Sequence, residues 1–174
     1  MNRTLIFRAL LTALTFCAAS APAQDRDDPA AERASFTLAE GFEAALFASE
    51  KDAVVKPIQI RFDARGRLWV IGSTVYPQIE PGQAPDDKVL ILEDTDGDGR
   101  CDRTTVFADG LMVPTGLETL ADGSGCYVGH GTELLLLKDT DGDGRADTRE
   151  VVLRGFGTAD SHQNINSFAW GASG

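Results

Sequence analysis

The chain has 174 residues and a formal net charge of −11 at pH 7, with 27 acidic side chains against 16 Lys and Arg. Such an acidic balance excludes nucleic acid as a partner. Much of the acidity is concentrated in two short loops, where bound cations would neutralise it. The charge therefore does not by itself predict a charged protein partner.

Residues 1–23 have the features of a secretory signal peptide. Arg3 and Arg8 give a positive start, residues 10–19 are mostly apolar, and small residues end the segment. The apolar stretch is too short and badly flanked for a membrane span, so we expect no transmembrane span in this chain. The sequence predicts export to the periplasm or the cell surface, and cleavage would change the net charge from −11 to −13 because it removes two arginines and no acids.

Residues 24–35 are polar and charged, with Pro and Ala, which is typical of a flexible linker. We expect ordered structure to begin near Phe36. Two cysteines, Cys101 and Cys126, remain after cleavage. An exported chain permits a disulfide between them, but the sequence equally allows two free thiols.

Eight short strands are predicted in two groups of four. Residues 57–62 alternate apolar and polar side chains, and a turn at residues 63–66 leads to a second strand at 68–71. A long loop with three prolines spans residues 72–87. The remaining strands are expected at residues 88–93, 103–108, 115–120, 125–129, 134–138 and 148–153, and residues 165–170 would begin a third group.

Four antiparallel strands in each repeat of about 45 residues are typical of a β-propeller blade. The predicted fold class is all-β, with residues 36–174 forming an incomplete propeller of two blades and the start of a third. A two-hairpin sandwich is the competing interpretation. Because propellers need about four to eight blades to close, we expect an N-terminal fragment whose missing C-terminal blades belong to its own full-length protein.

One acidic motif, Asp-Thr-Asp-Gly-Asp-Gly-Arg, occurs at residues 94–100 and again 45 positions later at 139–145. Carboxylates at loop positions one, three, five and nine repel one another unless a cation lies among them, and glycine at position six permits the sharp turn of a calcium loop. The flanking runs look like strands, so we expect calcium-binding hairpin loops, although a solvated acidic turn is the alternative. The predicted calcium-loop residues are Asp94, Asp96, Asp98, Arg100, Asp102, Asp139, Asp141, Asp143, Arg145, Asp147 and, at position twelve of the second copy alone, Glu150.

His162 is the candidate catalytic residue. It precedes a predicted innermost strand, which would place it near the mouth of a propeller channel, where ligands usually bind. A hydrogen-bonding loop histidine is the alternative. His130 is a weaker candidate on the same face. Asn164 and Asn166 would either line that pocket or cap the backbone.

Several stretches together resemble the PVC-type membrane-bound dehydrogenase family. They are residues 41–50, residues 56–63 with 66–70, the two acidic loops, and residues 155–158 followed by His162 and residues 165–168. The resemblance implies the N-terminal part of a propeller. Members often carry a haem-attaching Cys-x-x-Cys-His segment, which this sequence lacks, so haem binding does not carry over.

Residues 160–163 are more distantly similar to soluble quinoprotein sugar dehydrogenases. That similarity implies that His162 takes the hydroxyl proton of a small-molecule sugar or alcohol while hydride passes to pyrroloquinoline quinone. The residues that would hold the quinone are expected in later blades. The function expected from it is that of a quinone-dependent dehydrogenase in the full-length protein, with this fragment inactive. A non-catalytic, calcium-stabilised propeller that binds a polysaccharide or a protein partner is the alternative.

Overall fold

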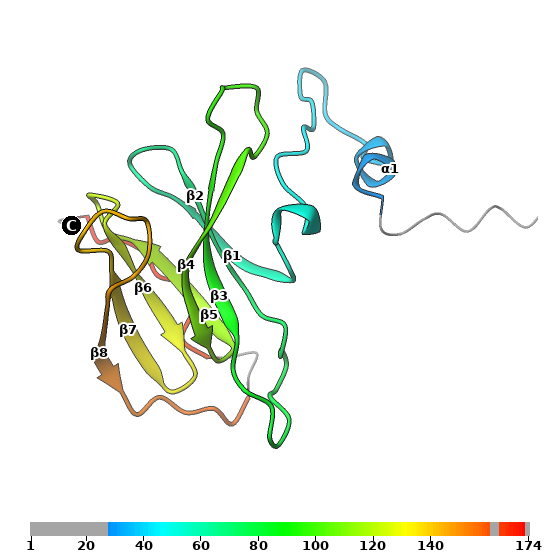
Figure 1. Ribbon diagram of the computed structural model, residues 1–174. Helices are drawn as coiled ribbons and strands as arrows, with labels where there is room; N and C mark the ends of the chain where they lie inside the picture. The colour runs from blue at the N-terminus through cyan, green and yellow to red at the C-terminus, as the bar shows by residue number, and fades with distance from the viewer. Residues whose placement is uncertain (1–27, 161–163, 173–174) are drawn as a thin grey trace, which may run out of the picture.

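The computed structural model describes residues 28–160 and 164–172 (Figure 1). The predicted signal peptide and His162 lie outside these residues. Two short helices, α1 (Pro29–Ala34) and the 3-10 helix η1 (Glu50–Asp52), precede the strands. The strands are β1 (Pro57–Phe62), β2 (Leu68–Gly72), β3 (Asp87–Glu93), β4 (Arg103–Leu111), β5 (Pro114–Thr119), β6 (Gly125–His130), β7 (Glu133–Lys138) and β8 (Thr148–Arg154).

The eight strands form two antiparallel sheets, in which every strand pairs with its neighbours in sequence. Sheet A has the order β1-β2-β3-β4 and sheet B the order β5-β6-β7-β8. In Figure 1 the two sheets lie next to each other, with the long loop after β2 extending well beyond the strands. The all-β class and the eight strands in two groups are therefore confirmed. The described residues contain no closed ring of sheets.

The register of pairing shows that the two sheets are copies of one unit. Each sheet has a cross-strand row of aliphatic side chains, flanked by a second row with an aromatic residue on its second strand. The aliphatic rows are Ile60–Val70–Leu90–Val106 in sheet A and Leu117–Val128–Leu135–Val151 in sheet B, and the aromatic rows are Arg61–Trp69–Ile91–Thr105 and Glu118–Tyr127–Leu136–Glu150. The repeat inferred from the acidic motif thus extends to whole sheets.

The two sheets share one hydrophobic core. Trp69, Ile91 and Phe107 of sheet A pack in the same buried cluster as Leu117 and Leu135 of sheet B. The Trp69 and Phe107 rings meet edge to face, with their centroids 4.6 Å apart, a geometry that aromatic quadrupoles favour. Successive side chains of a strand point to opposite faces. The aromatic row of sheet A therefore contacts the aliphatic row of sheet B.

The aliphatic row of sheet A lies on the other face and is covered in part by the chain that precedes the strands. Phe47, Ala48 and Val54 pack against Val70 and Leu90 there. We call the segment that contains Phe47, Ala48 and Val54 the N-terminal cover. It buries the side chains that β2 and β3 place on this face. On β1 the side chains of that face stay open: Ile58, Ile60 and Phe62 are 38%, 50% and 67% exposed.

The third predicted group of strands does not begin where the sequence indicates. Residues 165–170 form no strand, although the order of the repeat predicts one there. They lie instead against sheet B, where the Ile165 carbonyl accepts a hydrogen bond from Thr115 Oγ1 at 2.8 Å. A Cβ on Gly116 would come within 2.7 Å of that carbonyl oxygen, so glycine is required for this approach. A strand forms by pairing with a neighbour, and the described residues supply none here.

Two further sequence predictions are refined by the structure. Helix α1 occupies part of the segment expected to be a flexible linker, with Asp28 as its N-cap and no buried residue. Cys101 and Cys126 are free thiols, the second fully buried. Burial raises the pKa of the Cys126 thiol well above its usual range. Among the described residues, no helix is long and apolar enough to cross a membrane.

Candidate functional site

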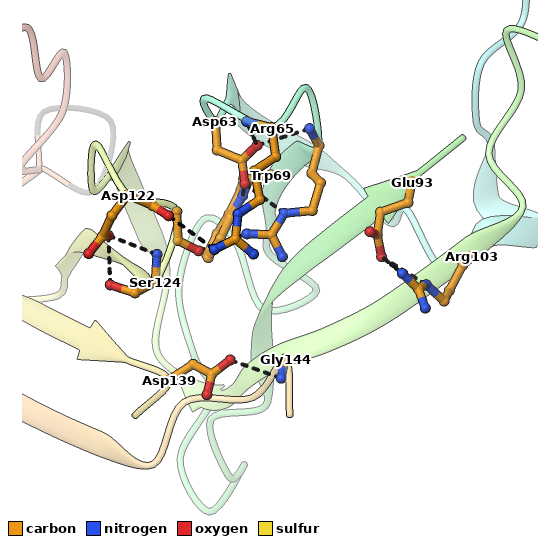
Figure 2. A network of polar contacts seen from close by, with 11 residues as sticks. Asp63, Arg65, Trp69, Glu93, Arg103, Asp122, Ser124, Asp139 and Gly144 are labelled. Carbon is orange, nitrogen blue, oxygen red and sulfur yellow. Dashed lines mark hydrogen bonds and ion pairs between the residues drawn. The ribbon is translucent and has the colours of Figure 1, made fainter. Parts of the chain in front are cut away.

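The two acidic loops connect β3 to β4 and β7 to β8, and they adopt the same conformation. The first aspartate of each loop accepts hydrogen bonds from the amides of both loop glycines: Asp94 from Gly97 and Gly99 at 2.7 and 2.9 Å, and Asp139 from Gly142 and Gly144 at 2.6 and 2.9 Å. All four glycines have positive φ, which L side chains rarely adopt. The Asp139 contact is drawn in Figure 2.

Three carboxylates converge in each loop. One oxygen each from Asp94, Asp96 and Asp102 lies within 4.8 Å of the others, and Asp139, Asp141 and Asp147 repeat the arrangement. These are positions one, three and nine of the predicted calcium loops. A compact set of carboxylate oxygens is the donor type that hard divalent cations prefer.

The other predicted loop residues lie outside these two clusters. Asp98 and Asp143, at position five, accept the amide hydrogens of Arg100 and Arg145 at 2.8 Å each. Glu150, predicted at position twelve, lies within β8 and pairs across the sheet with Leu136. The strand predicted at residues 148–153 already contained position twelve, and the structure places Glu150 in that strand and outside the cluster of loop carboxylates.

The carboxylates at position nine are held in their ionised form. The backbone amide and then the hydroxyl of Thr95 donate to Asp102 Oδ2, at 2.7 and 2.9 Å, and lower the pKa of that carboxyl. Thr140 lowers the pKa of Asp147 in the same way. Hydrogen bonds to the charged form favour it. Both groups are therefore negatively charged at neutral pH.

Each acidic loop also contacts the element that precedes its sheet. At position eight, the amide of Ala146 donates to the carbonyl of Phe107, in the outermost strand of sheet A, at 2.8 Å. The amide of Cys101 donates to the carbonyl of Phe47, in the N-terminal cover, also at 2.8 Å. The loops thus link neighbouring units as well as strands within a sheet.

At the same end of the molecule, a buried carboxylate connects the two sheets (Figure 2). Asp63 accepts hydrogen bonds from the amides of Arg65 and Arg67, from Arg67 Nε at 2.7 Å and from Trp69 Nε1 at 2.9 Å. Arg67 Nη2 then donates to the Gly123 carbonyl in the β5–β6 turn at 2.7 Å. Burial alone would raise the pKa of Asp63, but the hydrogen bonds from Trp69, Arg67 and Arg65 outweigh it and lower the pKa.

A second buried carboxylate, Asp87, lies at the opposite end, where β3 begins. It is 1% exposed. Its oxygens accept hydrogen bonds from Ser73 Oγ at 2.6 Å, from the Thr74 amide and hydroxyl at 2.7 and 3.1 Å, and from the Val113 amide at 3.0 Å. Asp87 therefore holds together the long loop after β2 and the connection between the two sheets. No sequence pattern distinguishes Asp87, since aspartates are common where a loop meets a strand.

His130, the weaker histidine candidate, has a structural contact in this region. Its Nδ1 accepts a hydrogen bond from the Met112 amide at 3.0 Å. Burial, and then the charge of Arg149, lower the pKa of the imidazole, while Glu133 and Asp87 oppose the shift. Both the contact and the pKa favour the neutral ring with Nδ1 unprotonated.

Asn164 and Asn166 lie on the segment that packs against sheet B. Asn166 Nδ2 donates to the Asn164 carbonyl at 2.9 Å, and its Oδ1 accepts from Ser167 Oγ at 2.8 Å. The Asn164 side chain is buried, and its Oδ1 has no hydrogen-bond partner among the residues that the structure describes. His162 falls in the gap before this segment, so its role stays a prediction.

The fold and the loops together describe an all-β protein built from repeated four-stranded sheets with acidic connections. Residues 28–174 match the family model named DUF7133, a domain of unknown function, and the chain therefore belongs to that family. No curated protein matches the chain. The resemblance to the PVC-type dehydrogenases stays a prediction.

Two solved structures from Trichoderma reesei are similar to the chain, both of Carbohydrate-Active Enzymes Family AA12. The iodide structure has 21% sequence identity and a TM-score of 0.51, and the match covers 69% of this chain and 28% of that one. The calcium structure has 20% identity and a TM-score of 0.42, covering 59% and 24%. At this identity the first match is evidence of a similar fold. The chain matches about a quarter of the length of these relatives.

Proposed function

We propose that the chain is the N-terminal part of an exported, calcium-stabilised β-propeller, and that the full-length protein oxidises a sugar or an alcohol with a quinone-type cofactor. The observation that carries the proposal is the fold similarity to a solved carbohydrate-active protein of family AA12. The family match adds no activity, because DUF7133 has no assigned function. The resemblance of residues 160–163 to quinoprotein sugar dehydrogenases supplies the reaction class.

The propeller part of the proposal is supported by the repeated interface. Sheet B packs its aliphatic row against the aromatic row of sheet A, and the acidic loop of one unit contacts the outermost strand of the unit before it. An interface between two copies of one unit generates a ring when the rotation between them closes. The matched relative is also several times longer than the aligned region, since only 28% of it is covered.

The donor set of the acidic loops fits calcium. Asp94, Asp96 and Asp102 would hold one ion, and Asp139, Asp141 and Asp147 a second, because each group offers clustered carboxylate oxygens. A bound cation would remove the repulsion among these charges and fix the loop between its two strands. Export to a compartment with millimolar calcium, which the predicted signal peptide implies, suits loops that lack a full ligand set.

Calcium should raise the thermal stability of the full-length protein. A ligand that binds only the folded state at a hundredfold excess over its Kd contributes about 2.7 kcal/mol per site, so we expect the unfolding midpoint to fall by roughly 5–15 °C when chelator replaces excess calcium. The measurement is calorimetry in the two conditions. Asp139→Asn should weaken the calcium response, whereas Asp109→Asn, an exposed change outside the loops, should leave it intact. Equal midpoints with and without calcium would contradict the proposal.

In the catalytic part of the proposal, His162 is the general base that accepts the substrate hydroxyl proton. An imidazole suits this role because its pKa lies near neutral pH. The quinone would supply the acceptor for the hydride. This chain contributes the base, and the cofactor-binding residues belong to the rest of the full-length protein.

The test is quinone-dependent dye reduction by the full-length protein with a panel of sugars and alcohols. We expect His162→Ala to lower kcat by at least about 100-fold, the contribution typical of a general base. His130→Asn is the matched control, because an amide oxygen can replace Nδ1 as the acceptor of the Met112 amide. Unchanged turnover in His162→Ala would remove the histidine from the mechanism. Saturable glycan binding without turnover would instead favour a non-catalytic binding module.

A further inference from the structure

The N-terminal cover of sheet A resembles the outermost strand of a sheet. Its sequence, Leu46-Phe47-Ala48, is similar to Val106-Phe107-Ala108 in β4. The Phe47 carbonyl accepts the position-eight amide of the first acidic loop, and the Phe107 carbonyl accepts the position-eight amide of the second, each at 2.8 Å. The two segments thus make the same contact with successive units of the repeat.

The side chains of the two segments also pack alike. Phe47 and Ala48 pack in the cluster of Leu90 and Leu92, the aliphatic face of sheet A, together with Cys101 at position eight. The equivalent contact on sheet B is made by the Phe107 and Ala108 pair, packed in one cluster with Leu135, Leu137 and Ala146. Residues 45–49 therefore occupy, relative to sheet A, the place that β4 occupies relative to sheet B.

The difference between the two segments is what lies on their inner side. In β4, Val106 pairs with Leu90 of β3, and the rest of sheet A continues inward. Residues 45–49 belong to no sheet, and within the described part of the chain the amides of residues 45–48 donate no hydrogen bond. The segment thus has the position of a fourth strand but lacks the three inner strands with which it would pair.

The face that those three strands would cover is open. Ile60 and Phe62 are 50% and 67% exposed, whereas their register equivalents in sheet B, Leu117 and Thr119, are 0% and 5% exposed because sheet A covers them. Apolar β-strand side chains exposed in this way mark an interaction surface. The surface is continuous with the N-terminal cover, since both lie on the aliphatic face of sheet A.

We propose that residues 45–49 are the outermost strand of a further four-stranded sheet, whose three inner strands come from a C-terminal part of the same polypeptide and cover Ile58, Ile60 and Phe62. The proposal rests on the propeller part of the proposed function. An intact sheet B from a second copy does not fit the site, because its own β8 already fills the position that residues 45–49 occupy. The contact joins the start of the domain to its last sheet and closes the ring.

The chemistry of the missing strands follows from the repeat. In sheet A, the face that packs on the aliphatic row of sheet B carries the aromatic Trp69 on its second strand and the aliphatic Val89 and Ile91 on its third. We expect the same residue types on the missing strands. The third strand must also leave its outer edge free, so that residues 45–49 can pair with it through backbone hydrogen bonds.

Hydrogen exchange of the full-length protein tests the strand pairing. We expect amides among residues 45–48 to exchange at least about 100-fold more slowly than an unstructured chain, as paired amides do. Exchange at the unstructured rate would overturn the proposal. Protection that disappears on dilution would also overturn the proposal, because the inner strands would then come from a second copy. A reading frame that closes directly after Gly174 would overturn it as well.

Side-chain substitution tests the covered face separately. Phe62→Ser should lower the unfolding midpoint of the full-length protein by several degrees, because a covered apolar side chain is lost. Phe42→Ser is the matched control, since Phe42 is 75% exposed and lies outside the sheets. Equal, small shifts for both variants would overturn the proposal. Dye reduction reports on the proposed activity alone, so a protein that turns over substrate with unprotected amides would refute only the ring closure.

Discussion

Asp87→Ala should be among the most destabilising single substitutions in the described residues. It removes a buried carboxylate that accepts hydrogen bonds from Ser73, Thr74 and Val113, and it leaves two backbone amides without that acceptor. Hydrogen bonds to a charged group contribute about 1.5–3 kcal/mol each, and buried donors left unpaired add a desolvation cost. We expect a loss of about 3–5 kcal/mol from these contributions together, which corresponds to roughly 10 °C in the unfolding midpoint.

The adjacent residue provides a matched control for Asp87. Asp86 forms an ion pair with Lys88 at 2.7 Å, but its side chain is 71% exposed. Exposed pairs contribute little, typically under about 1 kcal/mol, so Asp86→Ala should melt within about 2 °C of the parent protein. Thermal unfolding of both variants makes the comparison. Similar midpoints for the two variants would show that Asp87 does not hold the long loop and the sheet connection together.

Asp63→Asn should weaken the contact between the two sheets at the acidic-loop end. The side-chain amide of the variant can still accept hydrogen bonds through its oxygen, but its NH₂ group would lie against the N–H donors of Arg67 and Trp69. The Arg67 guanidinium also loses its counter-charge. Breaking a buried ion pair on one side costs about 3–5 kcal/mol. Arg65→Ala is the control, because Arg65 reaches the Asp122 carbonyl only at 3.3 Å and from an exposed position. Urea unfolding at pH 7 should separate the two variants clearly.

The same substitution should change the pH dependence of stability. The pKa of Asp63 is lower in the folded protein than its ordinary value of 3.8. The unfolded state therefore binds the proton more tightly, and the stabilisation is fully present above about pH 4 and is lost as the pH falls through the folded pKa. Asp63→Asn should lose less stability than the parent between pH 5 and pH 3, measured by urea unfolding. Parallel pH profiles would contradict the assignment.

The sequence predicted the strands well because two strong local signals agreed. Alternating or continuous apolar runs marked each strand, and Asp- and Gly-containing turns separated them, as at residues 63–66 between β1 and β2. The position of the acidic loops followed from the same logic. The strand predicted at residues 165–170 shows the limit of reasoning from the repeat: the order of strands placed one there, but pairing depends on a neighbour that the order does not reveal.

The long-range contacts of the candidate site could not be predicted from the sequence. Asp94, Asp96 and Asp102 were identified from spacing within one loop, and the structure brings them together. Asp63 and Asp87 were not identified, because their importance comes from donors on other segments, such as Val113, which is 26 residues from Asp87. A buried aspartate and an exposed one look alike in a sequence until the chain around them is folded.

The two ends of the repeated sheets have diverged to different degrees. At the acidic-loop end, both copies keep the same length and the same hydrogen bonds, with aspartates 45 positions apart. At the opposite end, the connection between β2 and β3 spans residues 73–86, whereas only residues 131–132 separate β6 from β7. The connections therefore differ in length between the two copies at one end and agree at the other. The long loop changes the shape of that end of sheet A, while the four-stranded pairing of the two sheets stays the same.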